Sequence, residues 1–488
     1  MRYLSLLIVA SLFVFVFIAN SFAQSSETES LKNKVDMLEK ELQEIKGMLK
    51  QQIEKDVQKE KEIASLREEV QKKEVRVAAE EIPAQPATMN EAGGKESTKE
   101  VPYLAKPGTE LAEKNLAPQF GGIYTKPFLR RFGRSTYLGG YMDFQFRATE
   151  DENGNQGFDQ TRFIPFIYSD ISDRVKLASE IEFEHGGTGG GRDGEVILEF
   201  ATIDFLVTDW INWRGGFILT PLGKFNLMHD SPLQDLTDRP LVNQLIIPTT
   251  LTDAGMGFFG SFYPSELSKL DYEIYVTNGV FHGLDADGEI HIGETNGLRS
   301  SKSGYEFDNY NKSPGVVGRV QFSPFIGLEF GGSAYTCRYD ENNENQMTIP
   351  AFDFLYQRGP FELVGEGAYA FIDTNKFAED AGITDDMWGY YLEARYHFMP
   401  SLLKSWSPQI FTDNSTFTGV LRWDQVQTAG RDDNFESVHW LRNRLTPGLN
   451  YRYTEDTVFK LDYQINMEEK DMSSLANNAF LFSVATYF

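Results

Sequence analysis

From about residue 120 to the end of the chain, apolar and polar residues alternate with a period of two. A representative run is residues 457–467, which read TVFKLDYQINM. Successive side chains of a β-strand point to opposite faces, so such runs predict strands with one apolar and one polar face. About sixteen runs of this kind are present. The predicted strands cover residues 136–147, 159–169, 174–184, 195–207, 209–219, 255–263, 270–278, 315–322, 327–338, 350–357, 361–371, 388–398, 416–426, 443–453, 457–467 and 479–488.

The polar face of these strands is rich in charged residues, which favours a water-filled lumen over the interior of a packed sandwich. The apolar face of the last strand runs from Phe480 to the terminal Phe488. An apolar face that ends in an aromatic residue is typical of the lipid-facing side of an outer-membrane barrel. The pattern therefore predicts an all-β fold, an antiparallel transmembrane β-barrel of about sixteen strands in contact with outer-membrane lipid.

The connections between predicted strands alternate between short turns and long loops, as they do in bacterial barrels. An even number of strands places both ends of the barrel domain on one side of the membrane, and short turns are typical of the periplasmic side. We therefore expect the C-terminus and the N-terminal segments in the periplasm. Residues 399–415 break the pattern, because they form a turn of about seventeen residues where a short one is expected.

Three segments precede the barrel domain, which we place at residues 120–488. Residues 1–23 have a basic Arg2, an apolar run and a small-residue cleavage motif, so they are predicted to be a signal peptide. Residues 24–78 are predicted to form a periplasmic α-helical coiled coil, because residues 27–78 carry a heptad-like apolar stripe. A lone solvated helix is the alternative. Residues 79–119 form a Pro-rich linker. The stripe consists of Leu31, Val35, Leu38, Leu42, Ile45 and Leu49.

Charge and cysteine content limit the possible partners and cross-links. The formal net charge is −26, and beyond residue 120 there are 29 Lys and Arg against 52 Asp and Glu. A chain this acidic is not expected to bind nucleic acid. Cys337 is the only cysteine, so no disulfide can form within the chain. The six histidines have no zinc-type spacing, and we expect no metal, no cofactor and no catalytic residue.

The third long connection, residues 220–254, carries the strongest candidate chemistry. It combines charged residues with the apolar Leu241, Val242, Leu245, Ile246 and Ile247, which a solvated loop would not need. Folded into the barrel, it would narrow the lumen and influence selectivity. The alternative is an outward loop packed on a neighbouring subunit. The predicted pore-constriction residues are Lys224, His229, Asp230, Asp235, Asp238 and Arg239.

Taken together, the signal peptide, heptad segment, Pro-rich linker, strand pattern, the stretch PLGKFNLMHD and the terminal Phe resemble the phosphate-selective porin O and P family of Gram-negative bacteria. The resemblance implies a trimeric sixteen-stranded barrel with its third loop in the pore. It also implies anion preference from a ladder of arginines and a lysine cluster in the pore. Here inward acids are mixed with the bases, so a transverse field between a basic wall and an acidic loop is an equal alternative. The inward acids predict weak cation preference or none, unless local arginines dominate. The predicted lumen-facing wall residues are Arg147, Arg214, Arg319, Arg395, Arg422, Arg444, Arg452, Glu393 and Asp424.

We therefore expect an outer-membrane porin, a passive diffusion channel for small hydrophilic solutes or ions, including phosphate or other anions. We expect it to be a homotrimer and not an enzyme. Two alternatives remain open from the sequence. The first is a structural protein that tethers the membrane to peptidoglycan through residues 27–78. The second is an enzyme built on an outer-membrane barrel.

Overall fold

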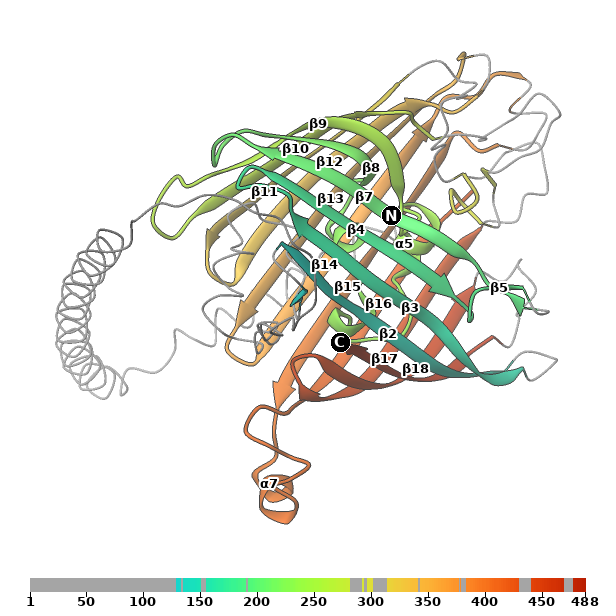
Figure 1. Ribbon diagram of the computed structural model, residues 1–488. Coiled ribbons are helices and arrows are strands. Elements are labelled where there is room, and N and C mark those ends of the chain that lie inside the picture. The colour runs from blue at the N-terminus through green and yellow to red at the C-terminus, as the bar shows by residue number, and fades with distance from the viewer. Residues whose placement is uncertain are drawn as a thin grey trace, which may run out of the picture. The chain divides into compact units, whose positions relative to one another are not determined.

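The computed structural model describes residues 129–132, 135–150, 155–189, 192–280, 292–293, 296–301, 314–340, 343–376, 378, 383–429, 440–468 and 477–488. These residues form a closed antiparallel β-barrel (Figure 1). The predicted signal peptide, coiled coil and linker lie outside the described residues.

Sixteen strands make up the closed ring, which confirms the predicted antiparallel barrel of about sixteen strands. Each of them overlaps one predicted strand, and the ends differ by a few residues. The strands are β2 (Thr136–Thr149), β3 (Gln156–Asp170), β4 (Val175–Glu184), β7 (Val196–Leu206), β8 (Asn212–Leu219), β9 (Thr252–Phe262), β10 (Lys269–Thr277), β11 (Gly315–Phe325), β12 (Leu328–Arg338), β13 (Gln346–Arg358), β14 (Phe361–Ile372), β15 (Asp386–Phe398), β16 (Thr416–Gln427), β17 (Leu441–Thr454), β18 (Thr457–Glu468) and β19 (Ala479–Tyr487).

The barrel closes where the last strand, β19, pairs with β2. Tyr487 lies opposite Tyr141, and the backbone N–H of Phe488 donates to the carbonyl oxygen of Gly140 at 2.9 Å. The ring of Phe488 also stacks on that of Phe163, with centroids 5.4 Å apart. Closure satisfies the backbone groups of both terminal strands, so the ring has no free edge.

Small strands accompany the barrel. The three residues of β1 (Arg130–Phe132) pair with the start of β2, beyond the point that β19 reaches. The two-residue strands β5 (Thr188–Gly189) and β6 (Arg192–Asp193) form a separate hairpin in the connection between β4 and β7. No helix in the described part of the chain is long and apolar enough to cross a membrane.

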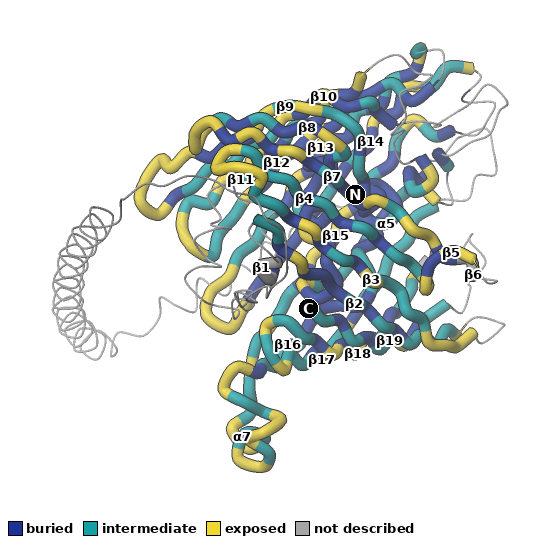
Figure 2. The backbone as a smooth tube through the Cα atoms, in the orientation of Figure 1, coloured by how far each residue is buried: buried dark blue, intermediate teal, exposed yellow. Residues whose placement is uncertain are grey.

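Alternation along each strand separates the two faces of the barrel, as Figure 2 shows by burial. On β18, Phe459 and Leu461 are exposed on the outside, whereas Lys460, Asp462 and Gln464 are buried on the inside. Exposed apolar residues recur around the outer wall in most strands. The strand pleat thus gives the barrel an apolar outer surface and places most charged wall residues inside.

Most turns at one end of the barrel are short. Gly327 and Gly359 occupy two of them with φ values of 89° and 58°, a conformation that tight hairpins need and glycine adopts without steric cost. The connection 399–415 at this end keeps its predicted length and contains the short helix α7 (Ser401–Trp406). It extends beyond the neighbouring strands in Figure 1.

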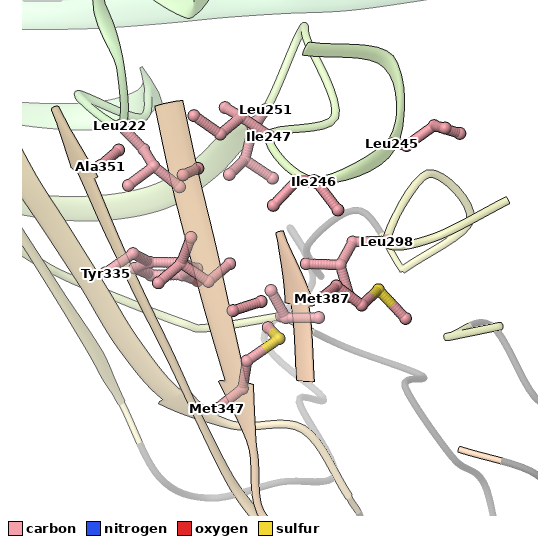
Figure 3. Close-up of a cluster of buried hydrophobic side chains, with 14 of the residues drawn as sticks. Leu222, Leu245, Ile246, Ile247, Leu251, Leu298, Tyr335, Met347, Ala351 and Met387 are labelled. Carbon is pink, nitrogen blue, oxygen red and sulfur yellow. The ribbon is translucent and has the colours of Figure 1, made fainter. Parts of the chain in front are cut away.

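Part of the lumen is apolar, which differs from the expectation of a water-filled interior. Inward residues of β10–β15, among them Tyr275, Tyr335 and Ile349, are buried in one hydrophobic cluster with residues of the connection after β8. Figure 3 shows Leu222, Ile246, Ile247 and Leu251 of that connection in this cluster. The sequence did not predict this apolar region, because many other inward faces are charged. The strand pattern also does not show which inward residues meet an apolar partner.

Candidate functional site

The connection between β8 and β9, residues 220–251, is called loop three below. It contacts inward side chains of β2, β12, β14 and β16–β19, so it lies inside the ring of strands. Pro221, Pro232, Pro240 and Pro248 interrupt it and keep its helices short. These helices are α4 (Lys224–Leu227), the 3₁₀ turn η3 (Ser231–Leu233) and α5 (Leu241–Leu245).

The start of loop three is attached to the wall by Glu366 of β14. This carboxylate accepts hydrogen bonds from the backbone N–H groups of Lys224 (2.6 Å) and Phe225 (2.9 Å) and from the Asn243 amide (2.6 Å). A Cβ on Gly223 would lie 2.5 Å from the same carboxylate, and its φ of 70° also favours glycine. The Lys224 ammonium is paired with Glu329. Lys224 is thus held at the wall by an acid.

Asp235 forms the central ionic contact of loop three. Its carboxylate lies 3.2 Å from Arg395 and 2.9 Å from Arg452, and it accepts a hydrogen bond from Asn450 at 2.8 Å. Burial opposes ionisation, but the two arginines outweigh it and hold the pKa of Asp235 at about 2. Asp235 therefore remains an anion and fixes loop three to β15 and β17.

Asp238 makes a second ionic contact three residues later. It lies 2.5 Å from Arg147 of β2 and 4.0 Å from Arg444 of β17, and it accepts a hydrogen bond from Gln464 at 2.7 Å. Burial raises its pKa, but Arg147 and Arg444 outweigh this, so the pKa of Asp238 is lowered. The contacts span β2, β17 and β18, so loop three reaches the strands on either side of the closure.

Arg422 and Asp424 of β16 hold the segment before α5. Arg422 donates to the backbone carbonyl of Asp238 at 3.0 Å, and it lies 2.9 Å from Asp424 and 3.6 Å from Glu393. Asp424 in turn accepts the backbone N–H of Leu241 at 3.0 Å. These side chains satisfy loop-three backbone groups that water would otherwise solvate.

His229 and Asp230 lie in a separate, fully buried group. The Nδ1–H of His229 donates to the carbonyl oxygen of Asn226 at 2.8 Å, and its Nε2 faces Glu199. Asp230 accepts from the Tyr487 hydroxyl at 2.9 Å. One ligand atom each from Glu180, His229 and Asp230 lie within 4.8 Å of one another. The carboxylates of Glu180 and Asp230 each have further partners. Proximity alone therefore does not make this group a metal centre.

Arg239 differs from the acids because it has no carboxylate within 4 Å in the part of the chain described. Arg239 and Arg299, which lies between β10 and β11, both donate to the carbonyl oxygen of Thr249. Burial and the nearby Arg162 lower the pKa of Arg239 to about 10, so it is still a cation at neutral pH. Neither of these two half-buried arginines forms an ion pair with a described acid, although Glu182 acts on both from a greater distance.

The remaining wall arginines of the prediction are paired with acids away from the charged residues of loop three. Arg214 is held by Asp204 through bonds of 2.7 and 2.8 Å, and Arg319 by Asp353 through bonds of 2.5 and 2.9 Å. Both arginines are buried. Ion pairs of this kind neutralise the charge that an arginine ladder would offer to an anion.

The structure thus brings Asp235 and Asp238 together with Arg147, Arg395, Arg422, Arg444 and Arg452. Lys224 and Arg239 lie in separate parts of the site. Arg214 and Arg319 are paired with acids of other wall strands. Sequence reasoning did not select Glu366, Arg299 or Glu199 for the site. Glu366 had a signal, because its strand position predicts that it points inward. Arg299 had none, since it lies in a connection whose course the strand pattern does not define.

Comparisons with known proteins agree with the barrel fold. No family model matches the chain. An uncharacterized protein of Aquifex aeolicus is 27% identical over 278 residues, which make up 54% of this chain and 61% of that protein. The chain thus spans about three fifths of the length of this curated relative.

Among solved structures, OmpF of Salmonella typhi in complex with daunomycin superposes with a TM-score of 0.50 and 11% identity. The match covers 72% of this chain and 97% of that one. An anion-selective porin from Comamonas acidovorans superposes with a TM-score of 0.46 and 11% sequence identity. This match covers 73% of this chain and 100% of that one. The outer membrane channel DcaP of Acinetobacter baumannii superposes with a TM-score of 0.43 and 10% sequence identity. This match covers 72% of this chain and 97% of that one. At these identities the likeness to OmpF concerns the fold alone.

Proposed function

We propose that this protein is an outer-membrane porin, a passive channel through which small hydrophilic solutes or ions diffuse without chemical turnover. The observation that carries the proposal is a closed barrel, apolar outside, whose lumen is crossed by a loop with ionic contacts to the wall. An apolar outer wall is stable in lipid, and a charged interior favours water and ions. The OmpF-like fold supports the same proposal.

In this proposal loop three forms the pore constriction. Its apolar part fills the lumen beside β10–β15, so the permeation path is restricted to the charged side of the loop. On that side Asp235 and Asp238 form ion pairs with wall arginines, whereas Arg239 and Arg299 form none with any acid in the described ranges. We therefore infer a mild preference for anions, among which phosphate is one candidate. Selectivity would arise from two arginines rather than from a long basic ladder.

Planar-bilayer recording tests the channel. Purified protein should add unitary, ohmic conductance steps in potassium chloride, because a wet lumen carries ions in both directions. The variant Arg358→Gln serves as a control that should conduct like the wild type, since Arg358 is exposed at the end of β13 opposite the outward Phe361. Protein that inserts into the bilayer but stays electrically silent at every voltage and salt concentration would remove the proposal.

The assembly and its orientation belong to the same proposal. We propose a homotrimer with the short-turn end, the C-terminus and the N-terminal segments in the periplasm, where residues 27–78 could contact peptidoglycan. The short turns support this orientation. Mass measurement in mild detergent checks the trimer, and a protein without residues 27–78 that still sediments with cell wall would contradict the peptidoglycan contact.

A further inference from the structure

The seventeen-residue connection 399–415 lies at the short-turn end, and its last part contacts the outside of the barrel. The hydroxyl of Tyr451, on the outer face of β17, donates to the carbonyl oxygen of Ile410. The ring of Phe411 contacts the rings of Tyr451 and Phe417, with centroids 5.6 and 6.0 Å apart. These contacts hold the end of the connection against the outer wall, whereas α7 extends beyond the neighbouring strands (Figure 1).

The connection exposes large apolar side chains. Leu402 and Trp406 of α7 are each 77% exposed, and Ile410 is 52% exposed. These three residues follow one another at intervals of four, and Leu402 and Trp406 lie on one side of α7. The only charged residues of the connection, Lys404 and Asp413, lie 3.1 Å apart. Large apolar side chains exposed together in this way do not stabilise a turn that is surrounded by water.

A groove adjoins this turn on the outer wall. It has a volume of about 370 Å³ and is lined by Ile410, Tyr451, Tyr453, Thr457 and Phe459. Aromatic residues continue on the same outer face beside it, where Tyr396 and Phe398 of β15 are also exposed. Aromatic residues at the rim of a barrel lie at the boundary between lipid headgroups and acyl chains.

We propose that α7 and this groove form a lipid-binding surface. The side chains of Leu402 and Trp406 insert into the leaflet at the short-turn end, and an acyl chain of a bilayer lipid occupies the groove. The surface is continuous with the apolar outer wall and carries no net charge, which suits the interface of a bilayer. Trp is favoured at this depth because its ring is apolar and its N–H can bond to headgroups. The inference rests on the proposed membrane location of the barrel.

Quenching of tryptophan fluorescence by brominated lipid tests the proposal. The full chain is folded into phosphatidylcholine vesicles whose acyl chains are either brominated or unmodified. Subtracting the emission of a Trp406→Phe variant from that of the wild type isolates the signal of Trp406. We expect brominated chains to reduce this signal roughly twofold or more, because the indole lies at the acyl boundary. The exposed position of Trp406 means that the variant keeps its packing.

A Trp423→Phe variant supplies the matched control, because Trp423 lies on the outer face of β16, opposite Leu392 of β15. Quenching of Trp423 without quenching of Trp406 would overturn the lipid-binding surface and leave the porin proposal intact. In that case quenching of Trp406 by aqueous iodide would indicate a water-exposed turn, and protection from both quenchers would indicate cover by a second copy of the chain. An unquenched Trp423 would instead contradict the membrane location itself.

Discussion

Replacing Arg239 of loop three and the neighbouring Arg299, which form no ion pair with a described acid, should reduce the preference for anions. At about 8 Å in water, a unit charge acts on a passing ion with about 0.5 kcal/mol. Salt at 0.1 M reduces this by roughly half. Each charge attracts chloride and repels potassium. Two such charges therefore contribute about 1 kcal/mol to the free-energy difference between the two ions, which sets the permeability ratio. The double variant Arg239→Gln, Arg299→Gln should therefore lower the chloride-to-potassium permeability ratio about fivefold.

The reversal potential across a bilayer with a potassium chloride gradient measures this ratio. The gradient should be centred near 0.1 M and then near 1 M, because the Debye length falls to about 3 Å at the higher concentration. We expect the difference between wild type and double variant to be large at low salt and nearly absent at high salt. Arg358→Gln removes one exposed charge away from loop three and should leave the ratio close to that of the wild type.

Two results would refute this reasoning. One is a double variant that folds, conducts and keeps the wild-type permeability ratio at 0.1 M. The other is a wild-type channel that prefers cations at 0.1 M, which would mean that the many inward acids outweigh Arg239 and Arg299. Glutamine can still donate to the carbonyl oxygen of Thr249, so a change in loop position is not the expected cause of an effect.

Three further predictions concern the attachment of loop three and the stability of the wall. Glu366→Ala leaves three donors unpaired, of which the two on Phe225 and Asn243 are buried and cost about 1–3 kcal/mol each, and should increase open-channel current noise. Glu366→Gln should be milder, because the Asn243 amide can turn its oxygen, which no described residue bonds, toward the new donor; equal noise in both variants would contradict this. Asp353→Asn leaves Arg319 buried without its anion and should lower the free energy of unfolding in detergent by about 3–5 kcal/mol, as urea titration can measure; an unchanged midpoint would show that the pair is not needed. The pKa of Asp235 is lowered from 3.8 to about 2, so its contribution to loop attachment is fully present above pH 3.8 and is lost as the pH falls through 2. Asp235→Asn should therefore increase the noise to a similar extent at pH 7 and at pH 4, because Asp235 is an anion at both; an effect of the substitution that disappears by pH 5 would contradict this.

Strand positions could be predicted from the sequence because each strand shows its own alternation of apolar and polar residues. The pleat sends alternate side chains to lipid and lumen, so the period of two survives without knowledge of any neighbour. The seventeen-residue turn at 399–415 shows how well this works, since an unexpected length turned out to be a real feature with its own helix. The observed β3 and β13 begin a few residues before their predicted starts, because pairing continues past the last clear alternation.

The interior could be predicted only in part. Alternation predicts that Arg395, Glu393 and Arg452 point inward, but it could not say that Arg395 meets Asp235 or that Arg214 meets Asp204. Partners in the first pair are 160 residues apart along the chain, and no local rule connects them. The apolar cluster behind loop three was missed for the same reason, since Tyr335 and Ile349 read as ordinary strand residues until Ile246 packs beside them.

The sequence by itself determined the all-β architecture, the number of strands and the direction in which each strand residue points, because these follow from a repeat of two residues. Only the tertiary structure decided which charges cancel. Ring closure brings β2, β16, β17 and β18 around loop three, and the resulting distances make Asp235 and Asp238 partners of arginines while Arg239 and Arg299 share a carbonyl oxygen. Coulomb interactions depend on separation in space, which one-dimensional order does not contain.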